Sequence, residues 1–377
     1  MNNAYHLLVN EIFGAGSAKP PTSLPANEVT GALQNETSYQ EFTARFGERL
    51  RRLAQAYTPS SPNRQKLLTK VNDVSATRWQ GPYAELCAYD FYNQRDAWPF
   101  RGLTLDVDLP NGSTYGAALG STGPANLDGL FDRYDVYTDV KVLKDNVTEI
   151  LNSVITQAVK QTGQTPRHYG WNWPHDKSVD TLNPHRSNLV NELAAALIKK
   201  PKAIPSAVVE NLVFRFDWTE GSLATEHSYN AYKHARSSHT LVFGYANKFI
   251  QSKPFLLTLV SFPWFNGVVT SFGGANKAFY RAFARRVFMQ YRLSQQPFST
   301  VQSKFNGPDT IHEVLRRISG IVFIEDLSLL GKAPESRQAR SYCFLNPHAA
   351  NPVPEIFRDY LRALDGLYFN DFKGDTY

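Results

Sequence analysis

The sequence predicts an α/β protein in which a central mixed β-sheet is flanked by helices on both faces, with additional mostly helical elements. Leu103–Leu109 alternates apolar and polar residues, as a half-buried strand does. Two further strand-like runs, Asn126–Phe131 and Val136–Leu143, are joined by four polar residues. An amphipathic helix then begins at Asn146 and stops at Gly163. The order of helix, three strands, helix and strand is typical of such a sheet.

The other elements follow from the same patterns of apolar spacing, caps and turn residues. Pro82 suits the first turn of a helix over Pro82–Asn93, and the Gly-, Pro- and Ser-rich stretch 14–36 predicts a loop or an extended arm. Further helices are expected over Tyr39–Tyr57, Asn188–Lys199, Asn276–Arg292, Thr310–Ile318 and Pro354–Leu364. Further strands are expected over Val208–Phe216, Phe255–Phe262 and Gly320–Glu325.

The composition indicates a globular protein with a full core. Hydrophobic residues make up 42% of the 377 residues and charged residues 20%, which argues against disorder on a large scale. No apolar run approaches about 18 residues, so no membrane span is expected. Residues 1–16 contain an acid and no leading basic cluster, which argues against a signal peptide. Cys87 and Cys343 stand alone, which predicts neither a disulfide framework nor a zinc site and favours a cytoplasmic location.

The expected hairpin places two acids opposite each other. If its four-residue turn is symmetric, Phe131 faces Val136, and the register then sets Asp128 against Asp139. Like charges so placed repel, and a hard divalent cation between them is the natural remedy, because such cations prefer carboxylate oxygens. Strand alternation puts Lys141 on the same face as Asp139. A lysine there can orient an attacking water or stabilise negative charge that develops on phosphorus.

Glu85 adds a third acid to this candidate site. On its helix it shares a stripe with Tyr89, so we expect the carboxylate to point inward. A buried acid needs a partner, and a cation between the two aspartates would supply one. By strand alternation, Asp106 and Asp108 are expected to point outward into solvent.

Glu85 on a helix, Asp128 on a strand and Asp139-Val140-Lys141 on the next strand, followed by an amphipathic helix, resemble the PD-(D/E)xK nuclease superfamily, which has the restriction-endonuclease-like fold. The resemblance covers roughly Gly81–Gln161. It implies that Asp128, Asp139 and Glu85 bind Mg²⁺, with Mn²⁺ as a substitute. It also implies that Lys141 is the catalytic lysine that assists the nucleophilic water.

The resemblance further implies a Mg²⁺-dependent endodeoxyribonuclease of the restriction or prokaryotic DNA-defence type, acting on double-stranded DNA. A homodimer and a regulatory or defence-system partner are compatible with that function. The family's RecB-like branch has Gln-x-x-x-Tyr on the helix after the lysine, whereas Gln157 is followed at that spacing by Gln161. No proline immediately precedes Asp128, which follows Asn126-Leu127. The implied regions are an N-terminal arm and helical region over 1–80, a nuclease core with insertions over 81–265, and a C-terminal region of helices and strands over 266–377 for DNA binding or dimerisation.

A basic stripe on helix Asn276–Arg292 is the candidate DNA contact. Its members lie opposite the apolar face of that helix and are Lys277, Arg281, Arg285 and Arg292. A net charge of +6 is compatible with a phosphate-bearing partner. The alternative for such a stripe is a solvated helix face.

Three other hypotheses stay open. Asp-x-Lys is a short pattern, and we interpret its second copy, Asp371-Phe372-Lys373, as solvated surface in a tail without a paired strand. His168, His175 and His185 allow an HNH-type nuclease, although the aromatic residues around them favour an ordered loop. The protein could also be a non-catalytic nucleic-acid-binding or protein-interaction module whose acidic cluster is incidental.

Overall fold

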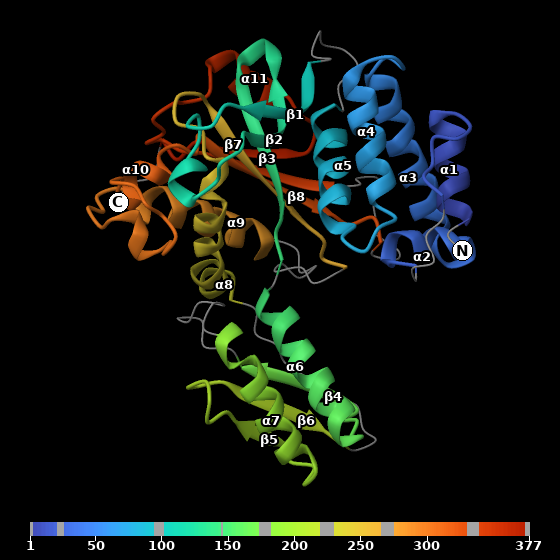
Figure 1. The fold of residues 1–377 in the computed structure, drawn as a ribbon, viewed down its shortest axis with the longest axis vertical. Helices are drawn as coiled ribbons and strands as arrows, with labels where there is room; N and C mark the ends of the chain where they lie inside the picture. Colours follow the sequence, from blue (N-terminus) through green and yellow to red (C-terminus); the bar gives the residue numbers. More distant parts are fainter. Residues whose placement is uncertain are drawn as a thin grey trace. The chain divides into compact units, whose positions relative to one another are not determined.

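A mixed sheet of seven strands forms the centre of the protein (Figure 1). The computed structural model describes residues 3–20, 26–93, 102–144, 146–172, 182–218, 230–264, 275–329 and 339–373. The chain divides into two compact units. The first consists of Met1–Leu143, Leu241–Thr270 and Val287–Tyr377, and the second of Lys144–Thr240 and Ser271–Arg286.

The central sheet belongs to the first unit. In spatial order its strands are β1 (Leu103–Leu109), β2 (Ala125–Phe131), β3 (Val136–Val142), β7 (Phe255–Ser261), β8 (Gly320–Asp326), β9 (Ala339–Leu345) and β10 (Leu367–Asn370). β2 runs antiparallel to both of its neighbours, β1 and β3, and β7 and β8 continue parallel to β3. β9 runs antiparallel to β8, and β10 runs parallel to β9. The prediction of an α/β fold with a mixed central sheet flanked by helices is therefore confirmed.

Helices from the N-terminal region cover this sheet. They are α1 (Asn3–Phe13), α2 (Glu28–Gln34), α3 (Glu36–Ala56), α4 (Pro62–Asp73) and α5 (Gln80–Tyr92), and later helices of the unit are α10 (Ile311–Leu315) and α11 (Glu355–Arg362). Figure 1 shows α3, α4 and α5 lying together beside the strands. Leu86 of α5 shares one apolar core with Val140 of β3, Val260 of β7 and Val322 of β8. Burial of this core is what fixes α5 against the sheet.

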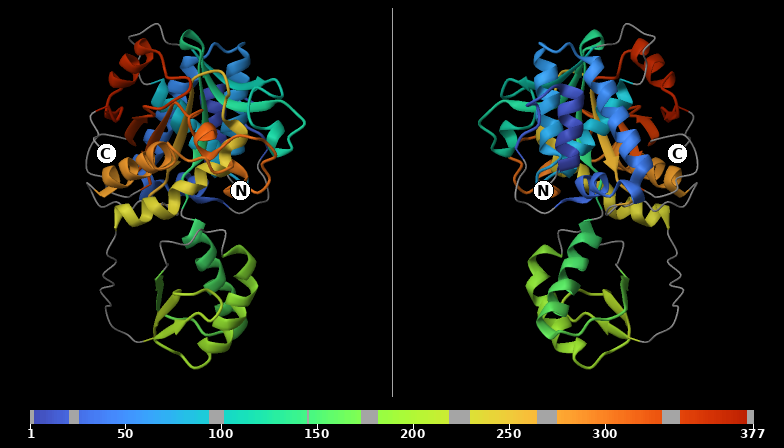
Figure 2. Two further views of the ribbon diagram at one scale, coloured as in Figure 1. Left: turned by 90° about the vertical axis from the view of Figure 1, so that its left-hand side faces the viewer. Right: turned by 90° about the vertical axis from the view of Figure 1, so that its right-hand side faces the viewer.

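The second unit is a smaller α/β assembly. It contains α6 (Asn146–Thr162), β4 (His168–Asn172), α7 (Arg186–Leu197), β5 (Ala203–Pro205), β6 (Val213–Asp217), α8 (Ala231–Ser238) and α9 (Ala275–Arg285). Its three strands form a separate antiparallel sheet in the order β4-β6-β5, with α6 and α7 on one face (Figure 2). Leu151 of α6, Leu193 of α7 and Phe214 of β6 meet in its own apolar core.

The predicted hairpin forms with the predicted register over three residue pairs. Phe131 pairs with Val136, Leu130 with Tyr137, and Gly129 with Thr138. A short 3₁₀ turn over Asp132–Tyr134 connects the strands. Asp135 follows in the left-handed region at φ 53°, which Asp tolerates better than most residues.

Several boundaries differ from the sequence prediction. The expected loop over 14–36 contains helix α2, because Asn27 and Thr30 form a capping box. The strand expected over Val208–Phe216 begins only at Val213. The α-helix expected over Asn276–Arg292 ends at Arg285 and continues as a π-helical turn over 286–290. Elements without a sequence prediction are α1, α4, α8, β4, β5, β9 and β10.

Two further findings concern the membrane and the cysteines. None of the helices that the structure describes is long and apolar enough to span a bilayer. Cys87 and Cys343 are both buried and form no disulfide.

Candidate acidic site

A kink in β1 brings an unexpected acid into the site. Asp106 has φ 47°, in the left-handed region, so strand alternation fails at this residue. Lys66 of α4 holds the kink, because its ammonium donates to the carbonyl oxygens of Leu105 at 2.7 Å and of Asp106 at 2.9 Å. The prediction that Asp106 faces solvent is wrong, whereas Asp108 on the same strand is exposed as predicted.

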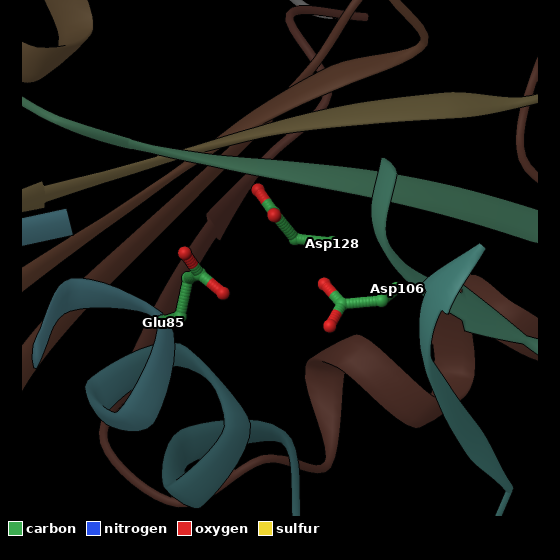
Figure 3. Close-up of side chains that lie close together, drawn as sticks. All are labelled: Glu85, Asp106 and Asp128. Atoms are coloured by element: carbon green, nitrogen blue, oxygen red, sulfur yellow. The ribbon is translucent and has the colours of Figure 1, made fainter. Parts of the chain in front are cut away.

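Three carboxylates converge where α5, β1 and β2 meet. Oxygen atoms of Glu85, Asp106 and Asp128 all lie within 4.8 Å of one another, and Figure 3 shows the three side chains pointing toward a common centre. All three are largely buried, with side chains 13%, 20% and 11% exposed. The inward orientation predicted for Glu85 is confirmed.

Asp128 lies at the point where the hairpin strands part. The paired ladder ends at Gly129 and Thr138, so the predicted direct pairing of Asp128 with Asp139 is not formed. Instead, Oδ2 of Asp128 accepts a hydrogen bond of 2.7 Å from the backbone N–H of Val140. The carboxylate thus replaces a backbone acceptor, which fixes its position without a strand partner.

The predicted lysine is close to both aspartates. The Lys141 ammonium forms a short ion pair with Oδ2 of Asp139 and lies 3.9 Å from Oδ2 of Asp128. Asp139 is fully buried, and apart from this ion pair neither of its carboxylate oxygens accepts a hydrogen bond from the part of the chain that the structure describes. Asp139 is not a member of the three-carboxylate group. Asp128 therefore connects two halves of the site, one with Glu85 and Asp106 and the other with Asp139 and Lys141.

Lys70 is a site residue that the sequence did not suggest. Its ammonium lies 2.6 Å from Oε2 of Glu85 and 3.0 Å from Oδ1 of Asp106. Lys70 lies one helical turn after Lys66 on α4, so both lysines reach the kinked end of β1 from one helix face. In the sequence, the only sign of this role would have been the two lysines four residues apart on a helix, and α4 was not predicted.

Tyr89 links Glu85 to the sheet. Its hydroxyl donates at 3.0 Å to the carbonyl oxygen of Asp128 and at 3.2 Å to Oε2 of Glu85. Because the hydroxyl has a single hydrogen, it donates to only one of these two acceptors at a time. The phenol therefore ties α5 to β2 at the centre of the site.

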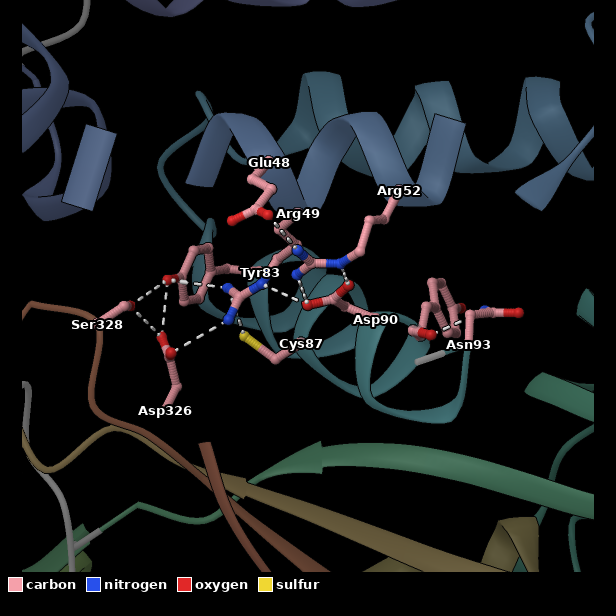
Figure 4. A network of polar contacts seen from close by, with 10 residues as sticks. Glu48, Arg49, Arg52, Tyr83, Cys87, Asp90, Asn93, Asp326 and Ser328 are labelled. Atoms are coloured by element: carbon pink, nitrogen blue, oxygen red, sulfur yellow. Dashed lines mark hydrogen bonds and ion pairs between the residues drawn. The ribbon is translucent and has the colours of Figure 1, made fainter. Parts of the chain in front are cut away.

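A buried ion network holds α5 from its other side (Figure 4). The Arg49 guanidinium of α3 contacts Asp90 of α5 at 3.4 Å and Asp326 at the end of β8 at 3.2 Å. Arg52 adds a two-pronged contact to Asp90 at 2.8 and 3.0 Å, and the Tyr83 hydroxyl donates to Asp326 at 2.7 Å. Because these charges are paired within the core, the network fixes the helix that carries Glu85.

Crowding of acids raises the affinity of the site for protons. Burial, and then the nearby Asp128 carboxylate, raise the pKa of Glu85 to about 7. The same two causes raise the pKa of Asp139 to about 7. Burial opposes the charged form of Lys70, but Glu85 and Asp106 outweigh it and raise the pKa of the ammonium. Asp139 and then Asp128 do the same for the pKa of Lys141, again against burial.

The donor set suits a hard divalent cation. Octahedral Mg²⁺ with oxygen ligands at about 2.1 Å places them roughly 3 to 4.2 Å apart, so carboxylates with oxygens within 4.8 Å could share one ion after small side-chain shifts. When all four carboxylates are ionised, they and the two ammoniums together carry a charge of −2, which a divalent cation would neutralise. Among the residues that the structure describes, this is the one group of acids, histidines or cysteines with such spacing.

The predicted basic stripe is not continuous. Lys277 is exposed on α9, and Arg281 and Arg285 are half-buried on the same helix. Arg292 lies beyond the π-helical turn, which changes the angular spacing and removes it from the 3.6-residue stripe. Lys277, Arg281 and Arg285 belong to the second unit, whereas Arg292 belongs to the first.

The other sequence candidates do not form a comparable group. His168 lies on β4 and His185 ends a 3₁₀ turn over Asn183–His185, while His175 lies outside the described residues. The second Asp-x-Lys copy directly follows β10, so the expectation of a tail without a paired strand is wrong. Its Lys373 is 67% exposed and lies 3.9 Å from Asp371, which agrees with a solvated surface pair.

The fold and the site together define an α/β protein with a buried acidic cluster and two lysines at one edge of its central sheet. Comparisons with protein-family models, with curated proteins and with solved structures find no match for the chain.

Proposed function

We propose that the chain is a Mg²⁺-dependent deoxyribonuclease that hydrolyses phosphodiester bonds of double-stranded DNA, with a restriction-endonuclease-like core. The observation that supports this proposal most strongly is the position of Asp128. It lies within 4.8 Å of Glu85 and Asp106 and also 3.9 Å from the ammonium of Lys141. Asp128 would therefore be a metal ligand that also lies next to Lys141, the lysine that the resemblance to PD-(D/E)xK nucleases implies is catalytic.

The roles of the residues follow from their positions. Glu85, Asp106 and Asp128 would hold Mg²⁺, which when bound supplies positive charge for the phosphate and acidifies a water ligand. Lys141 would orient the attacking water and stabilise charge on the phosphoryl oxygens. Asp139 would keep Lys141 charged and in place through its ion pair. An endonuclease of the restriction or DNA-defence type is the form that the resemblance favours.

A specific observation supports a second candidate, a non-catalytic interaction module. Lys70 already contacts Glu85 and Asp106, so the cluster contains a counter-ion of its own. An internal cation can stabilise buried acids without any metal. In that case the cluster would serve only to join α4, α5 and β1.

Cleavage assays separate the two candidates. Plasmid and linear DNA are incubated with the wild type, Lys141→Ala and Asp139→Asn in Mg²⁺ or EDTA, and Asp371→Asn/Lys373→Ala provides the matched control at the second Asp-x-Lys copy. The nuclease proposal expects Mg²⁺-dependent cleavage by the wild type and the control, and a loss of roughly 100-fold or more in Lys141→Ala. Equal cleavage by all variants would refute the site. DNA binding without cleavage in Mg²⁺ and Mn²⁺ would favour the module.

A further inference from the structure

Five basic side chains gather at one end of the small sheet in the second unit. Backbone hydrogen bonds bring their chain segments together. The N–H of Phe216 donates to the carbonyl oxygen of Lys202, and the N–H of Arg167 donates to the carbonyl oxygen of Asp217, each at 2.9 Å. The members of this basic end are all exposed and are Arg167, Lys199, Lys200, Lys202 and Arg215. Arg167 immediately precedes β4, the three lysines lie between α7 and β5, and Arg215 is the middle residue of β6.

The residues on either side of Arg215 in the sheet have small side chains. Phe214 and Phe216 are buried toward the helices, so Arg215 between them points to the outer face of the sheet. Its neighbours across the two ladders are Gly170 and Ala203. With no large side chain on either side, an extended polyanion can approach the guanidinium and the adjacent backbone closely.

Among the described residues, none of the five members of the basic end forms an ion pair with a carboxylate. One acid, Asp217, lies two residues beyond Arg215 on the same strand and therefore on the same face. Glu192, the acid on the preceding helix, instead accepts hydrogen bonds from Oγ of Ser206 at 2.7 Å and from the backbone N–H of Ala207. Lys200 lies over the ring of Trp218, with its ammonium 6.0 Å from the ring centre. A solvated face that served only solubility would more often alternate in sign.

We propose that this basic end of the second unit binds the phosphate backbone of double-stranded DNA. The choice of DNA as the polyanion rests on the proposed function. The chemistry is charge neutralisation without base contacts, so binding should be insensitive to base sequence and strongly dependent on salt. Arg215 supplies a planar donor for phosphate oxygens, and the three lysines supply point charges along the edge.

The test measures binding apart from cleavage. The full chain in EDTA is titrated against a fluorescent duplex over a range of salt concentrations, and the wild type is compared with Lys199→Gln/Lys200→Gln/Lys202→Gln. The control is Lys160→Gln/Lys233→Gln/Lys304→Gln, which removes the same charge from exposed lysines elsewhere. We expect the first variant to bind roughly tenfold more weakly near 0.1 M salt, with a salt slope smaller by about 2 to 3, and the control to bind like the wild type.

The possible outcomes distinguish DNA binding by the basic end from the proposed nuclease activity. Equal weakening of both variants, or no DNA binding by the wild type at low salt, would overturn the inference. Preference for single-stranded DNA or RNA over the duplex would also overturn it. Weakened binding in the first variant together with an inactive wild type in Mg²⁺ would keep the inference and refute the nuclease.

Discussion

The ammonium of Lys70 lies 2.6 Å from Oε2 of Glu85, and the same atom is 3.0 Å from Asp106. Two of the three converging carboxylates thus share a protein cation. A divalent ion that enters the cluster must either displace this ammonium or lie close to it. The apo protein and the metal-bound protein would consequently use the same acids in two different ways.

Replacing Lys70 tests that competition. In Lys70→Met the acids lose their counter-ion, so we expect the protein in EDTA to lose roughly 1 to 3 kcal/mol of stability. Mg²⁺ should bind roughly tenfold more tightly, because a like charge a few ångströms away is removed. The measurements are thermal unfolding in EDTA and calorimetric titration with Mg²⁺.

Lys66 provides the matched control for Lys70. It lies on the same face of α4 but contacts carbonyl oxygens, not carboxylates. Lys66→Met should weaken the fold near β1 without tightening Mg²⁺ binding. Unchanged or weaker Mg²⁺ binding in Lys70→Met would contradict the competition between the two cations.

Two substitutions at Asp106 distinguish its role in the backbone kink from its role as a metal ligand. Asn tolerates the left-handed conformation, so Asp106→Asn should fold and yet bind Mg²⁺ at least about tenfold more weakly. A β-branched residue does not tolerate that conformation, so Asp106→Val should also lose about 1 to 3 kcal/mol of stability. Asp108→Asn, on the exposed side of the same strand, is the control. Wild-type Mg²⁺ affinity in Asp106→Asn would exclude this residue from the site.

The raised pKa of Glu85 predicts how stability depends on pH without metal. The folded state holds a proton up to about pH 7, whereas an unperturbed glutamate releases it near 4.5. Because the folded state binds more protons in this window, stability conferred by protonated Glu85 falls as pH rises through it. We therefore expect the Tm of Glu85→Gln, relative to wild type in EDTA, to rise from pH 5 to pH 8.

Bound Mg²⁺ should reverse this trend, because the ion requires the ionised carboxylates. Mg²⁺ affinity of the wild type should increase from pH 6 to pH 8, with protons released on binding. Glu41→Gln, on the exposed side of α3, should behave like the wild type in both measurements. A pH-independent difference between Glu85→Gln and wild type would be inconsistent with the crowded acid.

Local patterns predicted much of the sheet and half of the site. Alternation and the short polar turn gave the register at Phe131 and Val136, and apolar spacing gave the inward orientation of Glu85. These features depend on residues close in sequence. Asp139 and Lys141 lie on a single strand, so their placement on one face could be predicted from the sequence as well.

The rest depended on contacts between distant segments. Asp106 escaped detection because a single left-handed residue, held by Lys66, breaks the alternation on which the prediction relied. Lys70 escaped because its role comes from the approach of α4 to β1 and α5. The π-helical turn after Arg285 likewise has no signature in the spacing of basic residues.

The proposed metal site is tested most directly by calorimetric titration of the full chain with Mg²⁺, comparing wild type with Asp128→Asn. An asparagine oxygen can still accept from the N–H of Val140, so the variant should keep its fold while losing the charge that joins both halves of the site. We expect one saturable Mg²⁺ site in the wild type and in Asp371→Asn, with an affinity at least about tenfold weaker in Asp128→Asn. Equal binding by wild type and Asp128→Asn, or no binding by the wild type, would contradict the proposed metal site.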